Sequence, residues 1–470
     1  MTSSAPPEPE QEPLVLDPSG ADPHAEHRAL HARGPATRVD ILGVPAWSVS
    51  DPALLKTLLT RPDVSKDGRA HWPAFAETVR IWPLALWVVF TSYGADLRRL
   101  RRITAPAFSA RRVAALRPVV ERITAGLLDD LAALPPDAPV DLREKLAYPL
   151  PVAVIGHLMG VPEEQYAHFR TVVDGVFDTP LSREEAMANT GTLYVVLDEL
   201  IATRRAQPGD DLTSLLLATP DEEGAEPALS HEELRDTLLL VISAGYETTV
   251  NVIDQAVYAL LSVDGQLDLV RSGRVGWADV VEETLRHEAA VKHLPLRYAV
   301  RDIPLPDGRT IARGEAILAS YAAANRHPGW HDDADVFDAG RLSKEHLAFG
   351  HGVHFCVGAP LARLEVEVCL RLLFTRFPGL TLDLPAEGLP PFPSLISNGH
   401  RHLPVRLHGA APLRLALSAH RAEMRLRRDW GCRFAARAGP RLASGAGRAG
   451  AGCGVAGLRV RPLASDPAGH

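Results

Sequence analysis

Apolar residues recur with a helical period through most of the chain from about Arg98 to Leu261, and the clearest repeat follows Ser230. Ser230 and Glu233 have the S-x-x-E spacing of a capping box, which satisfies free N–H groups at the start of a helix. Apolar positions then keep the helical period as far as Leu260. The pattern predicts a helix of about 30 residues, roughly 45 Å long, which we expect to cross the core.

Shorter patterns surround this long helix. Strand-like alternation between turn residues marks the segments 37–50, 298–317 and 380–407, and the first of these turns at Gly43. Helical spacing marks the segments 52–59, 280–287 and 359–377, and the first of these follows Asp51. Residues 66–94 show no clear period and are expected to form a long loop of the kind that often carries function. The predicted fold class is mainly α with a minor β part.

The two ends of the chain differ in composition from its middle. Residues 1–20 are rich in Pro and Glu and are expected to be disordered. Residues 409–470 are rich in Ala, Gly and Arg; they are either a basic tail that binds an acidic partner or nucleic acid, or a disordered extension outside the fold. Their low complexity and few aromatic residues favour the second interpretation. Residues 21–408 are therefore predicted to form the functional domain.

Composition and charge narrow the class of protein. The 470 residues are 46% hydrophobic and 23% charged, as in a globular protein. The net charge of -8 argues against a nucleic-acid partner, although residues 409–470 hold eleven arginines against three acidic residues.

Localisation follows from the cysteines and the apolar runs. Four cysteines are too few for a disulfide framework, and the acidic, Pro-rich start is not typical of a signal peptide. The longest apolar run, residues 81–90, is much shorter than the roughly 20 residues of a membrane span. We expect a cytoplasmic protein with no membrane span.

The candidate chemistry centres on one cysteine. The segment Phe349–Gly358 reads F-G-H-G-V-H-F-C-V-G and places Cys356 just before a predicted helix with Pro360 in its first turn. Glycines let a backbone lie against a flat ligand, and the N–H groups at a helix start stabilise a thiolate. A single thiolate in such a loop is one way in which proteins hold haem iron. A lone cysteine is more often a small buried hydrophobic residue, so the interpretation depends on the whole motif.

A second motif, Ala244-Gly245-Tyr246-Glu247-Thr248, lies midway along the long predicted helix. Glycine inside a helix costs about 1 kcal/mol relative to alanine and so needs a reason. Either a ligand needs the room beside the backbone, or another helix packs closely there. A threonine in this position also bonds the carbonyl four residues earlier and loosens the helical ladder.

The third motif pairs Glu283 with Arg286, three residues apart and thus neighbours on a helix surface. Taken alone, this spacing predicts only an exposed ion pair. It lies between the other two motifs in the chain, and the segment 335–341, which ends at Arg341, follows it.

Together the three motifs, in this order, resemble the cytochrome P-450 family over about residues 20–408. Residues 349–358 match the family's haem-binding signature F-x-x-G-x-[HR]-x-C-x-G. The resemblance implies that Cys356 is the axial ligand of haem b, iron protoporphyrin IX. It assigns further cofactor contacts to Phe349, Gly350 and Gly358 in the loop, to Ala244 and Gly245 on the long helix, and to Arg101, Arg297 and His354 as partners of the haem propionates.

The resemblance also implies roles for the remaining motif residues. Thr248 would hold the proton network and Glu247 would supply protons, since the reduction of dioxygen consumes protons. Glu283, Arg286 and Arg341 would form a buried charge triad behind the haem, with a structural role.

One position departs from the family's pattern. Many soluble bacterial members have H-x-x-x-R where this chain has Leu97 four residues before Arg101. We therefore expect one hydrogen bond to a haem propionate to be missing.

The predicted function is that of a haem-thiolate monooxygenase in secondary metabolism. It would place one atom of dioxygen in a C–H bond or an alkene and release the other as water. Electrons are expected from ferredoxin and ferredoxin reductase, and so indirectly from NAD(P)H, because residues 409–470 leave no room for a fused reductase. The basic segment 98–112 is either a docking site for an acidic ferredoxin or an ordinary solvated helix face; its arginines are Arg98, Arg99, Arg102, Arg111 and Arg112. The alternatives are a haem peroxygenase that uses hydrogen peroxide and a non-catalytic haem-binding auxiliary protein.

The resemblance also suggests which residues line the substrate pocket. They are Trp82, Leu86, Val88, Val241, Ala244, Val291, Leu294, Leu395 and Ile396. This apolar lining predicts a small-molecule substrate, namely a mid-sized apolar organic compound of the polyketide, macrolide or terpenoid class.

Overall fold

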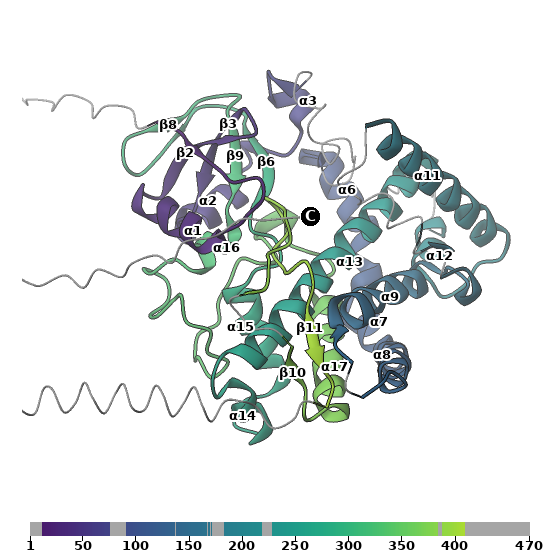
Figure 1. The fold of residues 1–470 in the computed structure, drawn as a ribbon. Coiled ribbons are helices and arrows are strands. Elements are labelled where there is room, and N and C mark those ends of the chain that lie inside the picture. Colours follow the sequence, from purple (N-terminus) through teal and green to yellow (C-terminus); the bar gives the residue numbers. More distant parts are fainter. Residues whose placement is uncertain are drawn as a thin grey trace, which may run out of the picture. The chain divides into compact units, whose positions relative to one another are not determined.

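Helices form most of the regular structure, as the ribbon in Figure 1 shows. The computed structural model describes residues 12–75, 91–136, 138–166, 168–169, 171, 183–218, 228–383 and 388–408. The α-helices are α1 (Pro23–Ala32), α2 (Pro52–Thr60), α3 (Gly68–His71), α6 (Gly94–Thr104), α7 (Ala110–Ala115), α8 (Arg117–Ala132), α9 (Pro149–Met159), α11 (Arg183–Ala206), α12 (Leu212–Leu217), α13 (His231–Ser262), α14 (Gln266–Arg271), α15 (Trp277–His287), α16 (Tyr321–Asn325) and α17 (Ala359–Arg376). Short helical turns are η2 (Ala105–Phe108), η3 (Arg143–Ala147), η4 (Glu163–Gln165) and η5 (Gly352–His354).

The strands belong to three small sheets. They are β1 (Leu14–Val15), β2 (Ala36–Ile41), β3 (Val44–Val49), β4 (Val64–Ser65), β5 (Val140–Asp141), β6 (Leu294–Ala299), β7 (Ile303–Pro304), β8 (Thr310–Ile311), β9 (Ala316–Ala319), β10 (Thr381–Leu382) and β11 (Pro404–Arg406). The largest sheet has the order β1-β2-β3-β9-β6-β4, and the others are β10-β11-β5 and β7-β8. The prediction of a mainly α fold with a minor β part is confirmed.

Helix α13 is the predicted long helix and the centre of the core. Its N-terminus has the capping box of Ser230 and Glu233, with both reciprocal hydrogen bonds formed. Helices α9, α15 and α17 pack against it, and their apolar side chains join one large buried cluster. In Figure 1 it runs between the helices α9, α11 and α12 and the part of the chain that carries the largest sheet. Burial on nearly all sides explains why its sequence is apolar well beyond a single stripe.

The N-terminal part contributes the largest sheet and its covering helices. Strands β2 and β3 form the predicted hairpin, which turns at Leu42 and Gly43, both with positive φ. Strand β1 pairs with β2 and lies inside the segment 1–20, for which the sequence predicted disorder; order therefore begins before residue 21. Pairing with β2 supplies hydrogen-bond partners for the backbone of β1, so this segment is ordered despite its Pro- and Glu-rich composition. Residues 1–11 lie outside the described residues.

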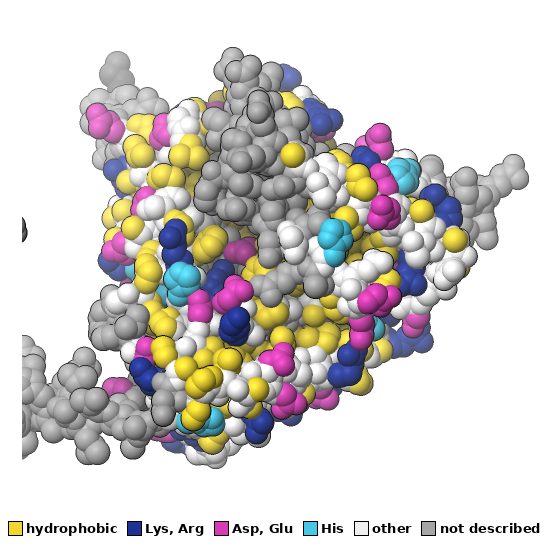
Figure 2. All heavy atoms as spheres, turned by 45° about the vertical axis from the view of Figure 1, so that its right-hand side comes forward, with side chains coloured by type: hydrophobic (Ala, Val, Ile, Leu, Met, Phe, Trp, Pro, Cys, Tyr) yellow, Lys and Arg dark blue, Asp and Glu magenta, His cyan; other side chains and the backbone are white. Residues whose placement is uncertain are grey.

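The described surface carries charges of both signs (Figure 2). Figure 2 shows one face, on which the described acidic and basic side chains are interspersed among apolar ones. In the part of the chain that the structure describes, no helix has both the length and the hydropathy that a membrane span requires.

The extension 409–470 lies outside the described residues, so its prediction rests on composition alone. We propose that the functional domain comprises the predicted residues 21–408 together with β1, which precedes them. Removing everything after His408 is expected to leave folding and cofactor content unchanged, because an Arg-rich, low-complexity segment buries little apolar surface. Thermal unfolding and cofactor absorbance of the shortened and full chains test this. A large loss of either would show that the extension belongs to the fold.

Candidate functional site

Cys356 lies in a tightly turned loop directly before α17. Its backbone N–H donates to the carbonyl oxygen of Phe349 at 2.9 Å, which closes the loop on itself. Gly350 and Gly352 have φ of 72° and 70°, a region that disfavours residues with a Cβ. A Cβ on Gly352 would also lie 2.7 Å from the carbonyl oxygen of Leu59 in α2. The glycines therefore allow the turn that holds the cysteine at the start of α17.

The thiol of Cys356 is accessible, yet opposing effects act on its charge. Desolvation by the surrounding protein raises the pKa of this thiol. The backbone N–H groups of Gly358 and Ala359 and the guanidinium of Arg101 lower the pKa. Desolvation prevails, so a positive partner beside the sulfur would favour the thiolate, and a metal ion is such a partner.

Basic side chains gather beside this loop. Arg101 on α6 donates to the carbonyl oxygen of Phe355 at 2.8 Å, and Arg297 on β6 donates to the hydroxyl of Tyr321 at 3.3 Å. His354 lies in the same loop, one residue before Phe355. Desolvation and then the charges of Lys66, Arg297 and Arg101 lower its pKa to about 2.

The structure thus brings together the three residues predicted as propionate partners, Arg101, Arg297 and His354, and adds Lys66, which sequence reasoning missed. Nη1 of Arg297 is buried and has no hydrogen-bond partner among the described residues. Leu97, the departure from the family pattern, is a buried apolar residue of α6 at 4% exposure and adds no polar group here.

One stretch of α13 is accessible although most of the helix is buried. Ala244 is exposed, and Val241 and Thr248 are half-buried. Positions 241, 244 and 248 share one face because they are three and four residues apart. Oγ1 of Thr248 donates to the carbonyl oxygen of Ala244 at 2.7 Å, the backbone contact predicted from the motif. The accessible face of the central helix is therefore mainly apolar and carries one hydroxyl.

The reason for Gly245 lies in helix packing. A Cβ on Gly245 would stand 2.7 Å from Cδ1 of Ile155 on α9. Of the two reasons open at the sequence level, the structure supports close packing of a second helix. A cofactor contact by the backbone of this residue stays a prediction.

Glu247 belongs to a buried polar network. It lies 3.6 Å from Nη2 of Arg143 and accepts a hydrogen bond from Nδ2 of Asn251 at 3.2 Å. Arg143 also donates to Oδ1 of Asn251 at 2.9 Å and lies 3.8 Å from Asp254. Burial raises the pKa of Glu247, and the charge of Arg143 opposes this rise. No local signal could have identified Arg143, since it reaches α13 from the separate turn η3.

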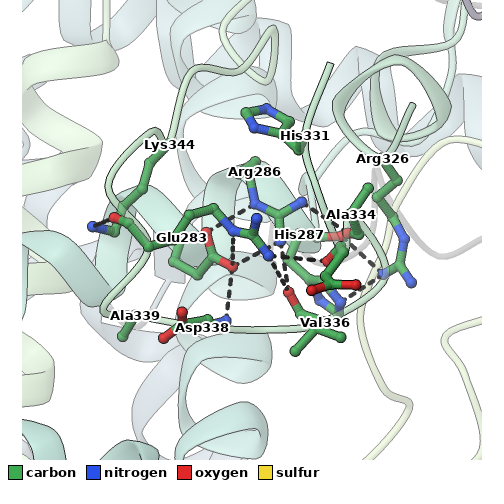
Figure 3. Close-up of polar contacts among 12 residues, drawn as sticks. Glu283, Arg286, His287, Arg326, His331, Ala334, Val336, Asp338, Ala339 and Lys344 are labelled. Atoms are coloured by element: carbon green, nitrogen blue, oxygen red, sulfur yellow. Dashed lines mark hydrogen bonds and ion pairs between the residues drawn. The ribbon is translucent and has the colours of Figure 1, made fainter. Parts of the chain in front are cut away.

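The pair Glu283 and Arg286 is fully buried and bidentate, as the close-up in Figure 3 shows. Nε and Nη2 of Arg286 donate to the two carboxylate oxygens of Glu283 at 2.8 and 2.7 Å. Arg341 approaches Oε1 of Glu283 at 3.5 Å, and the N–H of Asp338 donates to the same oxygen at 2.8 Å. Arg286 also donates to the carbonyl oxygens of Ala334 and Val336. The predicted triad residues therefore meet, and an exposed ion pair is excluded.

The residues predicted to line a substrate pocket are only partly described. Trp82, Leu86 and Val88 lie outside the described residues. The segments around Val291 and Ile396 lie side by side, because Val291 pairs with Ser397 and the N–H of Lys292 donates to the carbonyl oxygen of Ile396 at 2.7 Å.

The side chains of these two segments differ in burial. Val291, Leu294 and Ile396 are half-buried, whereas Leu395 is buried in the apolar cluster that contains Trp72 and Tyr298.

Comparisons with known proteins agree with this site. A family model described as cytochrome P-450 matches residues 278–391. The chain is 42% identical over 408 residues to 2-hydroxy-5-methyl-1-naphthoate 7-hydroxylase of Streptomyces carzinostaticus, which covers 85% of this chain and 98% of that protein. It is 35% identical over 408 residues to 6-deoxyerythronolide B hydroxylase of Saccharopolyspora erythraea, covering 84% and 98%.

A solved structure, that of CYP154A1 from Streptomyces coelicolor A3(2), shares 71% identity and a TM-score of 0.78 over 84% of this chain and all of that one. Together these findings define a haem enzyme of the monooxygenase class. The chain belongs to the cytochrome P-450 family. The resemblance, fold and enzyme class expected from the sequence are confirmed, as are haem b and dioxygen, which this family uses.

The residues present fit this cofactor. Haem b carries two anionic propionates, and the orphaned nitrogen of buried Arg297 lies among further cations that repel one another. The accessible thiol of Cys356 could ligate haem iron, whose positive charge would favour the thiolate.

Proposed function

We propose that this enzyme hydroxylates or epoxidises a mid-sized apolar organic compound in bacterial secondary metabolism. The names of the relatives support this, since one hydroxylates a naphthoate and another 6-deoxyerythronolide B. The accessible, mainly apolar face of α13 at Val241, Ala244 and Thr248 suits such a substrate. The observation that carries the proposal is the accessible Cys356 beside a basic cluster at the start of α17.

In this proposal Cys356 would hold the haem iron through its sulfur, and Arg101, Arg297 and His354 would bind the propionates. Phe349, Gly350 and Gly358 shape the loop around Cys356, and Ala244 and Gly245 would be the cofactor contacts on α13. When bound, the haem activates dioxygen. Thr248 and Glu247 then hold and supply protons on the side of α13, and Glu283, Arg286 and Arg341 keep the loop 332–341 in place.

The carbon monoxide difference spectrum of the reduced protein tests this proposal. A thiolate-ligated haem gives a Soret maximum far to the red of a histidine-ligated one. A red-shifted maximum supports the assignment, and a histidine-type maximum or a lack of haem would overturn it. Product formation with peroxide alone, and none with NAD(P)H and redox partners, would favour the peroxygenase alternative.

Changing Glu247 to glutamine is expected to lower product formation by roughly 10²-fold, the smaller end of what a positioned acid contributes. Glutamine can still accept the hydrogen bond from Asn251 but carries no acidic proton. The wild type should lose rate as pH rises through the raised pKa of Glu247, because only the protonated acid donates, and the variant should lack this loss. The rate of product formation across pH is the measurement. Glu232→Gln on an exposed turn of α13 is the control, and equal pH profiles for all three proteins would contradict the role.

We further propose that ferredoxin, reduced by ferredoxin reductase, docks on the basic segment near Cys356. Arg99 pairs with Glu233 and Arg112 with Asp210. The side chains of Arg98, Arg102 and Arg111 are exposed. Exposed Val353 and Phe355 add apolar surface next to the cysteine.

Arg111→Glu is expected to slow reduction of the haem by an acidic ferredoxin several-fold at low salt, because opposite charges steer association. The difference should shrink as salt rises. Stopped-flow reduction measured over a series of salt concentrations tests this, with Arg313→Glu at an exposed position of another loop as the matched control. A slowing that does not depend on salt would contradict electrostatic docking.

A further inference from the structure

Lys66 is buried and directly follows β4 of the largest sheet. Strands β4 and β6 are antiparallel, with Val64 paired to Ala299 and Ser65 to Tyr298. Continuing this register by one residue sets Lys66 opposite Arg297, and both are only 3% exposed. Like charges directly across an antiparallel pair repel each other, and burial strengthens the repulsion.

The two cations point to the face of the sheet that carries the rest of the basic cluster. Side chains alternate along a strand, so Ser65 and Tyr298 face the other way, where Tyr298 stacks on Trp72 with ring centroids 5.2 Å apart. Arg297 donates to the hydroxyl of Tyr321 at 3.3 Å, and a Cβ on Gly350 in the cysteine loop would lie 3.2 Å from that hydroxyl, so this face of the sheet borders the loop of Cys356.

Asp67, the residue after Lys66, caps a helix. Oδ1 of Asp67 accepts the N–H of Ala70 at 3.1 Å and caps α3. Its charge raises the pKa of Tyr298, which lies on the opposite face from Lys66. Nη2 of the Arg297 side chain donates to the hydroxyl of Tyr321, whereas its buried Nη1 has no partner among the described residues. The face that Lys66 shares with Arg297 is thus a cationic site that suits a ligand with more than one negative charge.

We propose that Lys66 is a fourth haem-propionate partner, which supplies the contact that Leu97 cannot make. This inference rests on the proposed function, because it requires haem in the site beside Cys356. An ammonium on a flexible stem reaches a carboxylate as a point charge, so a lysine from β4 replaces a histidine from α6 without the same geometry. The haem is then anchored from the sheet side by Lys66 and Arg297 and from the helix side by Arg101.

Haem transfer to excess apomyoglobin tests the assignment on the full chain. Lys66→Met is expected to speed haem loss roughly tenfold or more, the size expected when one charge-assisted hydrogen bond is lost. Lys66→Arg should restore most of the retention because it keeps the charge. Lys145→Met, at an exposed position in η3, is the matched control and should leave the rate unchanged.

Reconstitution with the dimethyl ester of haem b separates propionate binding from a structural role. The ester has no propionate charge, so wild type and Lys66→Met should then lose haem at equal rates. Equal rates with haem b itself, or the same acceleration with both haems, would overturn the assignment. Lys66→Gln, with a polar tip in the buried site, serves if Lys66→Met does not fold. A wild type that retains no thiolate-ligated haem would instead contradict the proposed function.

Discussion

Replacing Cys356 by serine is expected to abolish the red-shifted Soret maximum of the reduced carbon monoxide complex and nearly all product formation. A serine hydroxyl stays protonated at neutral pH and is a poor ligand for haem iron, whereas the thiolate is a strong one. The fold should survive, because the cysteine side chain is accessible and its loop is closed by the backbone bond to Phe349, which serine retains. The measurements are the difference spectrum, haem content and circular dichroism of the purified variant.

The control for this prediction is the second described cysteine. Cys369 is buried in α17 among the apolar side chains of the main cluster. Cys369→Ala should lower stability slightly through lost packing and leave the spectrum unchanged. A wild-type spectrum from Cys356→Ser would show that another residue ligates the iron, and the proposed site would be wrong.

Features that depend on neighbouring residues could be predicted from the sequence. The capping box at Ser230, the cap at Asp51 and the turn at Gly43 are local rules, and the structure has each of them. Within each of the three motifs the functional residues have a fixed spacing, so one helix or one loop positions most of them. This is why Glu283 and Arg286 meet within α15.

Features that depend on contacts between distant segments could not be predicted in this way. Lys66 meets Arg297 only because β4 pairs with β6, and Arg143 meets Glu247 only because η3 packs on α13. A buried lysine or arginine looks like any surface charge in a sequence, since its burial is set by tertiary packing. Gly245 shows the same limit, because its close neighbour Ile155 comes from another helix.

The second large effect is expected at the buried pair of Glu283 and Arg286. Glu283→Gln removes the charge that neutralises Arg286, and both side chains are 0% exposed. Leaving one buried charge unpaired costs about 3–5 kcal/mol, a large part of the roughly 5–15 kcal/mol that stabilises a typical domain. The variant should unfold at much lower denaturant concentration and hold less haem, because the loop 332–341 loses its anchor.

Glu282, the residue next to Glu283 on α15, provides the control for this prediction. It lies on the same helix but is partly exposed, and it pairs with Arg363 and His346. Glu282→Gln should cost only about 0–1 kcal/mol, the usual value for an ion pair near the surface. Urea unfolding of both variants gives the comparison. The double variant Glu283→Gln with Arg286→Met should lose less than the sum of the single losses, since it no longer leaves the guanidinium of Arg286 buried without its carboxylate. Equal losses for Glu282→Gln and Glu283→Gln would mean that the buried network around Glu283 contributes no more to stability than an ion pair near the surface.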